Sequence, residues 1–161
     1  MSLSDRRRLI LALAALPLAA CGFTPAYAPG GAGQALRGRV RAADPRTSQE
    51  FDFVAGIETR LGRPQAPLFD LSYTITTSER GAARGAGLGA TRITRFGTVA
   101  YQLTDRATGA VVTEGSLRNF TNYSTTDTQL ASRRAAEDAQ SRLMRILADQ
   151  VAARLVAAMT E

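Results

Sequence analysis

The residue of this chain with the most distinctive chemistry is its single cysteine, Cys21. It follows Leu18-Ala19-Ala20, and a leucine and two small residues before a cysteine form the bacterial lipoprotein box. At such a box the thiol takes a diacylglyceryl group, the chain is cleaved before the cysteine, and the new amino group is acylated. One acyl chain holds a protein to a membrane marginally, whereas two or three hold it firmly. The pattern predicts that Cys21 is a lipidation site; the alternative is a buried structural cysteine after an ordinary signal peptide.

The residues before the cysteine have the layout of a signal peptide. Arg6, Arg7 and Arg8 form a positive cluster, and the uncharged run Leu9–Ala20 follows it. As a helix this run would cover only ~18 Å, well short of the ~30 Å hydrocarbon core of a membrane. We therefore expect residues 1–20 to be a signal peptide that is removed, and not a membrane span.

The segment after the cysteine is rich in proline and glycine. Residues 21–34 include Pro25 and Pro29, and we expect them to form an acylated N-terminus and a flexible tether. Gly22 occupies the position at which an aspartate would signal retention in the inner membrane, so the outer membrane is favoured. Residues 35–161 are then a single domain, because a mature chain of this length builds one core.

Composition narrows the kinds of chemistry available to the mature chain. There is no histidine, and acylation would consume the only thiol, so the usual general base, metal ligand and nucleophile are missing. We expect no enzyme activity, no catalytic residues, no metal and no cofactor. Arginine supplies all 20 positive charges, and loss of the signal peptide lowers the net charge from +6 to +4. Export makes an anionic lipid or glycolipid a better partner than nucleic acid.

Hydrophobic periodicity predicts the secondary structure. Thr47 and Glu50 have the spacing of a capping box, which begins a helix, and Gly62 ends it after Leu61. Gly97 suggests a bulge within a strand. The predicted elements are a strand Leu36–Arg41, a helix from Thr47 to Leu61, strands Leu68–Thr76, Thr91–Thr104 and Val111–Tyr123, and a helix Thr126–Met159 capped by Thr126 with Gln129.

The pattern predicts an α+β fold, a two-layer sandwich in which two helices pack on one face of a four-stranded sheet, in the order strand-helix-strand-strand-strand-helix. The last helix carries an apolar stripe that we expect to cover the sheet: Leu143, Leu147, Val151 and Leu155. Thr77–Ala90 is glycine-rich and is expected to be a long mobile loop that leaves Arg80 and Arg84 accessible. These two arginines could contact an anionic partner; the alternative is that the loop is only solvated and contacts none.

The start LAACGFTPAYAP, a Tyr-x-Ile strand and the final helix with Leu-Ala-Asp-Gln-Val at Leu147–Val151 resemble the LPS-assembly lipoprotein family LptE, in its alphaproteobacterial form. The resemblance implies an outer-membrane lipoprotein on the periplasmic side, which lies as a plug in the lumen of the β-barrel LptD, assists assembly of that barrel and binds LPS. It implies no catalysis. The LPS-binding residues that we expect are Arg80, Arg84, Arg92 and Arg95.

Two other interpretations remain open. One is an auxiliary lipoprotein of another envelope lipid-transport system of the ABC type, which would carry the same anchor. The other is a cell-wall enzyme that uses carboxylates, which would require a concave site with perturbed carboxylate pKa values.

Overall fold

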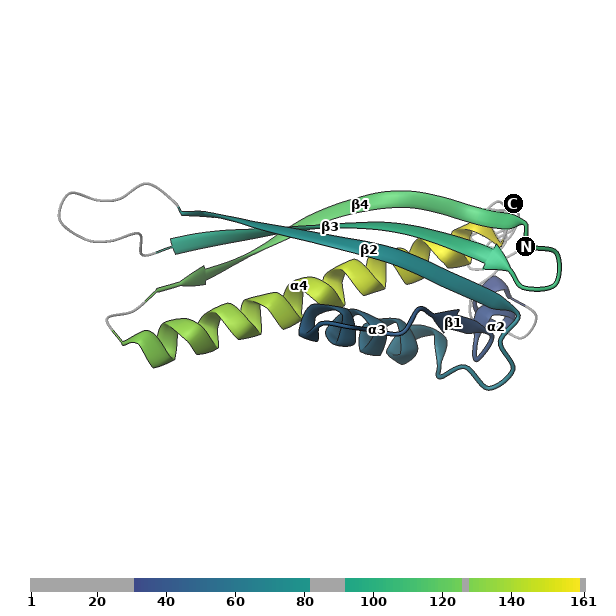
Figure 1. Ribbon diagram of the computed structural model, residues 1–161, viewed down its shortest axis with the longest axis horizontal. Helices are drawn as coiled ribbons and strands as arrows, with labels where there is room; N and C mark the ends of the chain where they lie inside the picture. The colour runs from purple at the N-terminus through teal and green to yellow at the C-terminus, as the bar shows by residue number, and fades with distance from the viewer. Residues whose placement is uncertain (1–30, 82–91, 126–127, 160–161) are drawn as a thin grey trace, which may run out of the picture.

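The computed structural model of the chain describes residues 31–81, 92–125 and 128–159. Its four strands form one sheet in the order β1-β2-β3-β4, in which β1 is parallel to β2 and the other neighbours are antiparallel. Two helices, α3 and α4, lie on one face of this sheet (Figure 1), which confirms the predicted two-layer α+β fold. The elements are α2 (Ala32–Leu36), β1 (Val40–Ala42), α3 (Ser48–Leu61), β2 (Phe69–Gly81), β3 (Arg92–Asp105), β4 (Val111–Ser124) and α4 (Gln129–Ala158).

The first strand is shorter than the sequence pattern predicts. It begins at Val40, whereas Leu36 ends the short helix α2 and is fully buried. Between them Gly38 adopts a φ of 70°, a left-handed conformation that glycine reaches without steric cost. This turn interrupts the alternation that suggested a continuous strand. Helix α2 also includes residues 32–34, which the sequence pattern assigns to the tether.

Helix α3 begins and ends at the predicted residues, although its cap differs in one detail. The hydroxyl of Thr47 accepts a hydrogen bond of 3.3 Å from the backbone N–H of Glu50. The carboxylate of Glu50 accepts from the N–H of Arg46 at 2.6 Å, one residue before the donor that a capping box uses. Gly62, with a φ of 78°, ends the helix as expected.

Strand β2 is longer than predicted, and this changes the position of Arg80. The strand continues to Gly81, and the pairs run from Thr77 opposite Gly97 to Gly81 opposite Ile93. Arg80 therefore lies in a paired strand and not in a loop. The alternation of apolar and polar residues fades in this part because both faces carry polar or small residues, and backbone pairing alone extends the strand. Residues 82–90, with Arg84, lie outside the described residues.

Gly97 is not a bulge. It pairs in register with Thr77 and Asn119, and the irregularity of the sheet lies instead at Leu103 and Thr104. A β-carbon at Gly97 would lie 3.0 Å from Cδ2 of Leu143 and 3.1 Å from Cδ1 of Leu147. The glycine thus permits the close approach of α4 to β3.

Helix α4 covers the sheet with the predicted stripe. Leu143, Leu147, Val151 and Leu155 are all fully buried, so the interpretation of this stripe as core is confirmed. The helix begins at Gln129 with Thr128 as its N-cap, so Gln129 is the first helical residue and not the third, as the predicted cap requires. Thr126 lies outside the described residues. Within the described part of the chain, no helix has the length and apolarity that a membrane span needs.

Candidate functional site

The structure separates the residues that the sequence singles out. Arg80 and Arg92 lie on the face of the sheet opposite to α3 and α4, which we call the open face. Arg95 lies on the face covered by the helices. Cys21 and Arg84 fall outside the described residues. Only two of the five predicted site residues therefore share one surface in the described structure.

Arg95 joins the sheet to α4 through several hydrogen bonds. Its guanidinium donates to Oε1 of Glu79 at 2.7 Å, to the carbonyl of Ala136 at 3.1 Å and to Oε1 of Gln140 at 2.9 Å. Only 14% of its side chain is exposed. The hydroxyl of Tyr123 also donates to Glu79, and burial followed by the negative charge of Glu79 raises the pKa of Tyr123. These contacts argue against the ligand-binding role expected for Arg95 and indicate that it holds α4 against the sheet.

A cluster on the open face combines two arginines with two aromatic rings. The guanidinium carbon of Arg80 lies 5.8 Å from the ring centroid of Phe96, and that of Arg118 lies 5.1 Å from the same centroid. The rings of Phe96 and Phe120 are 6.0 Å apart between centroids. We call this group the aromatic–arginine cluster; its members are Arg80, Phe96, Arg118 and Phe120.

The strand register explains why these side chains meet. Phe96 pairs directly with Phe120, and directly paired residues project from the same face of a sheet. Arg80 pairs with Thr94 and Arg118 pairs with Thr98, so the two arginines stand diagonally on opposite sides of Phe96. Three members of the cluster are missing from the residues that the sequence singles out. Phe96, Arg118 and Phe120 can be identified as neighbours only when the pairing between the strands is known.

The charges of the cluster are not neutralised by neighbouring acids. Among the ion pairs of the described residues, none involves Arg80 or Arg118. The nearest carboxylate along the open face of β4 is that of Glu114, four residues from Arg118 or about 13 Å along a strand, and it accepts a hydrogen bond from Gln102. Phe120 is 54% exposed. The cluster therefore presents two available positive charges beside an exposed aromatic ring.

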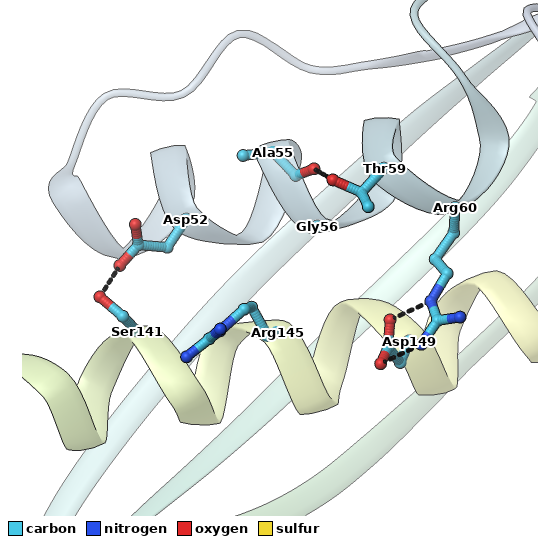
Figure 2. A pocket seen from close by; sticks show the side chains of 8 residues that line it. All are labelled: Asp52, Ala55, Gly56, Thr59, Arg60, Ser141, Arg145 and Asp149. Carbon is cyan, nitrogen blue, oxygen red and sulfur yellow. Dashed lines mark hydrogen bonds and ion pairs between the residues drawn. The ribbon is translucent and has the colours of Figure 1, made fainter.

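A groove lies between α3 and α4. The groove has a volume of about 370 Å³. Across it the hydroxyl of Ser141 donates to Asp52 at 2.7 Å and Nη2 of Arg60 donates to Asp149 at 2.7 Å (Figure 2). The helices approach closely at Gly56, where a β-carbon would lie 2.6 Å from that of Ala148. The polar side chains of the groove thus bond across the two helices.

The electrostatics of this groove suit ion pairing better than catalysis. Hydrogen bonds from Arg60 lower the pKa of Asp149 below its ordinary value, and the charges of Arg60 and Arg145 act in the same direction. A carboxylate that donates a proton near neutral pH would need the opposite shift. Within the described ranges, no group of three or more histidine, cysteine, aspartate or glutamate side chains could hold a metal. The groove is best explained as the contact that holds α3 against α4.

We expect Asp149→Asn to lower stability slightly and in a pH-dependent way. The pair with Arg60 is about half exposed, so its loss should cost less than ~1 kcal/mol at neutral pH. Because the folded pKa of Asp149 is lowered, the contribution exists above the unfolded pKa near 3.8 and disappears as the pH falls through the folded value. Urea denaturation of the parent and the variant from neutral pH to below pH 4 tests this. A difference that persists undiminished in acid would contradict the assignment, and Arg60→Gln should reproduce the loss at neutral pH.

The fold places the chain in a structural class that includes bacterial lipoproteins. No family model matches the sequence, and no curated protein matches it significantly. A presumed lipoprotein from Caulobacter crescentus has a similar structure, with a TM-score of 0.65 and 20% identity over 80% of this chain and 96% of its own. An uncharacterized lipoprotein B from Nitrosomonas europaea has a TM-score of 0.58 and 16% identity, over 84% and 91% of the two chains.

A named protein of this class is the rare lipoprotein B from Shewanella oneidensis. Its structure matches with a TM-score of 0.52 and 12% identity, over 76% of this chain and 92% of its own. At such identities the three likenesses establish a common fold. The fold shared with them is the two-layer α+β fold that the sequence pattern predicts.

Proposed function

We propose that the mature chain is a lipid-anchored outer-membrane protein that occupies the lumen of an LptD-type β-barrel, assists assembly of that barrel and binds LPS. The observation that carries the proposal is the fold. This chain has a lipoprotein box at Cys21, and it shares its fold with bacterial lipoproteins, among them a rare lipoprotein B. The resemblance of the sequence to the LptE family supplies the role. No catalytic step is part of this function.

The form of the domain supports a role as a plug. A protein enclosed by a barrel meets the barrel wall on several sides, and it must also fold in water before it enters. The open face of this sheet carries mostly threonine, serine and arginine side chains, while the apolar side chains gather beneath α3 and α4. Such a domain has a covered apolar core of its own and still offers a long polar surface to a partner.

The positions of the arginines support contact with an anionic glycolipid. Arg80 and Arg92 are exposed on the open face, and a planar guanidinium matches the geometry of a phosphate group. Arg84 stays a prediction, since it is outside the described residues. Arg95 is left out of the proposed contact because it is engaged with Glu79 and α4.

Purification of the tagged full-length chain from a detergent extract of its own envelope tests the partnership. We expect a β-barrel of LptD size to copurify, and an unrelated tagged outer-membrane lipoprotein to recover none of it. Recovery of an inner-membrane transporter component without the barrel would overturn the proposal in favour of an auxiliary role in another lipid-transport system. A carboxylate-based enzyme would instead hydrolyse cell-wall material and retain no barrel.

A further inference from the structure

We propose that the aromatic–arginine cluster is a binding site for a phosphate-bearing amphiphile, in which Arg80 and Arg118 hold the phosphate and Phe120 contacts the apolar part of the ligand. This proposal rests on the proposed function only because that function places the chain among such lipids. The proposed function does not specify the binding site or how the ligand is held. The residues of this site are Arg80, Phe96, Arg118 and Phe120.

Phe96 positions the two guanidinium groups. Both lie within cation–π distance of its ring, at 5.8 Å for Arg80 and 5.1 Å for Arg118, and they come from the two strands that flank β3. Long arginine side chains lose considerable conformational entropy when a ligand orders them. Here the ring already limits their movement, so less of that entropy remains to be lost on binding.

The surroundings of the cluster leave its positive charge available for an anion. Neither arginine belongs to an ion pair of the described residues, although acidic side chains occupy many other positions on the surface. By contrast, Arg60 and Arg95 are both bound to carboxylates. A phosphate that approaches Arg80 and Arg118 therefore competes with no ion-paired acidic side chain of the described residues. Guanidinium groups can also bond a phosphate through two parallel N–H donors.

The exposed ring identifies the ligand as an amphiphile. Phe120 is 54% exposed and lies beside Phe96, with the ring centroids 6.0 Å apart. A free phosphate ion would gain nothing from this ring, whereas a lipid could cover it with methylene groups and remove apolar surface from water. Phosphate binding and apolar contact at adjacent positions thus fit a phospholipid or a phosphorylated glycolipid.

Vesicle sedimentation tests the site with phosphatidylcholine vesicles that contain phosphatidic acid as the probe. The protein is residues 21–161 carrying Cys21→Ser and expressed without the signal peptide, so that neither a lipid anchor nor the apolar run of residues 9–20 holds it to the vesicles. We expect binding to these vesicles to exceed binding to pure phosphatidylcholine vesicles. The double variant Arg80→Gln with Arg118→Gln should bind roughly 30-fold more weakly, the factor expected when two arginines at an anionic surface are neutralised.

A matched control removes the same charge elsewhere. Arg133 and Arg134 are exposed on α4, behind the sheet, and their double replacement by glutamine should weaken binding by less than about threefold. Equal losses in the two double variants would show general charge attraction and would overturn the site. Undiminished binding by Arg80→Gln with Arg118→Gln would also overturn it.

Two further variants separate the parts of the site. Phe120→Ser should weaken binding roughly fivefold to tenfold while leaving both charges in place, because a half-exposed ring is lost. If it binds like the parent, and inorganic phosphate displaces the protein completely from the vesicles, the site binds phosphate alone and the amphiphile is excluded. Arg80→Lys with Arg118→Lys keeps the charge and checks the fold; it should bind between the parent and the glutamine variant. Failure of the barrel to copurify would leave this result unchanged, so the two proposals can fail separately.

Discussion

Leu147→Ala is expected to lower the free energy of unfolding by ~2–5 kcal/mol, as a large buried truncation does. Leu147 is fully buried in the middle of the stripe by which α4 covers the sheet. Its Cδ1 atom faces Gly97, where no side chain can move in to fill the space that alanine would leave. Urea denaturation measures the loss. Leu130→Ala on the same helix, where the side chain is 69% exposed, is the control and should change stability by less than ~0.5 kcal/mol.

The facing glycine offers a sharper form of this test. Gly97→Ala would place a β-carbon 3.1 Å from Cδ1 of Leu147 and 3.0 Å from Cδ2 of Leu143, so we expect this variant to cost ~1–3 kcal/mol through overpacking. In the double variant Gly97→Ala with Leu147→Ala, the added methyl group enters part of the cavity. The combined loss should therefore fall short of the sum by at least ~0.5 kcal/mol. Strict additivity would show that α4 does not pack on β3 at this point.

Local signals predict those elements whose boundaries depend on a few adjacent residues. The hydroxyl of Thr47 and the positive φ of Gly62 define the ends of α3, and both act within one helical turn. Gly109, with a φ of 72°, likewise marks the turn between β3 and β4. The first strand was predicted correctly, but its predicted start at Leu36 was wrong because Gly38 turns the chain before β1, and a short alternating run does not distinguish these conformations.

The alternation along each strand contains more information about the site than composition does. Val99, Tyr101 and Leu103 face the helices, and the same phase places Arg95 inside and Phe96 outside. Residue type alone predicts that every arginine is exposed. For this reason Arg80 and Arg95 were both predicted as LPS-binding residues. Continuing the phase from the apolar part of each strand would have separated them.

The phase of each strand does not predict which residues of β3 pair with which residues of β4. The register between β3 and β4 shifts at Leu103 and Thr104, next to the hairpin, so a count outward from the turn pairs the wrong residues. A slip of one residue would move Arg118 and Phe120 to the covered face. The meeting of these side chains with Phe96 therefore depends on a bulge that has no clear signal in the sequence.

We expect Cys21→Ser to abolish attachment of the protein to the membrane. The serine hydroxyl cannot form the thioether, and signal peptidase II cleaves only after lipid transfer to the thiol, so the variant should keep residues 1–20 or be cleaved elsewhere. Two or three acyl chains hold a protein firmly at ~0.8 kcal/mol per buried methylene, whereas nothing in the described residues could replace them as a membrane span. The loss should therefore be nearly complete.

Mass spectrometry of the purified protein decides whether this anchor exists. The parent should start at Cys21 and carry the added mass of a diacylglyceryl group and an amide-linked acyl chain. Pro17→Ala, one residue outside the box Leu18-Ala19-Ala20-Cys21, is the matched control and should be processed like the parent, whereas Leu18→Asp should block processing with the thiol still present. An unmodified Cys21 in the mature parent would refute lipidation. The folded domain would then need another means of membrane attachment, because the net charge of +4 on residues 21–161 and the polar sheet face supply no stable insertion of their own.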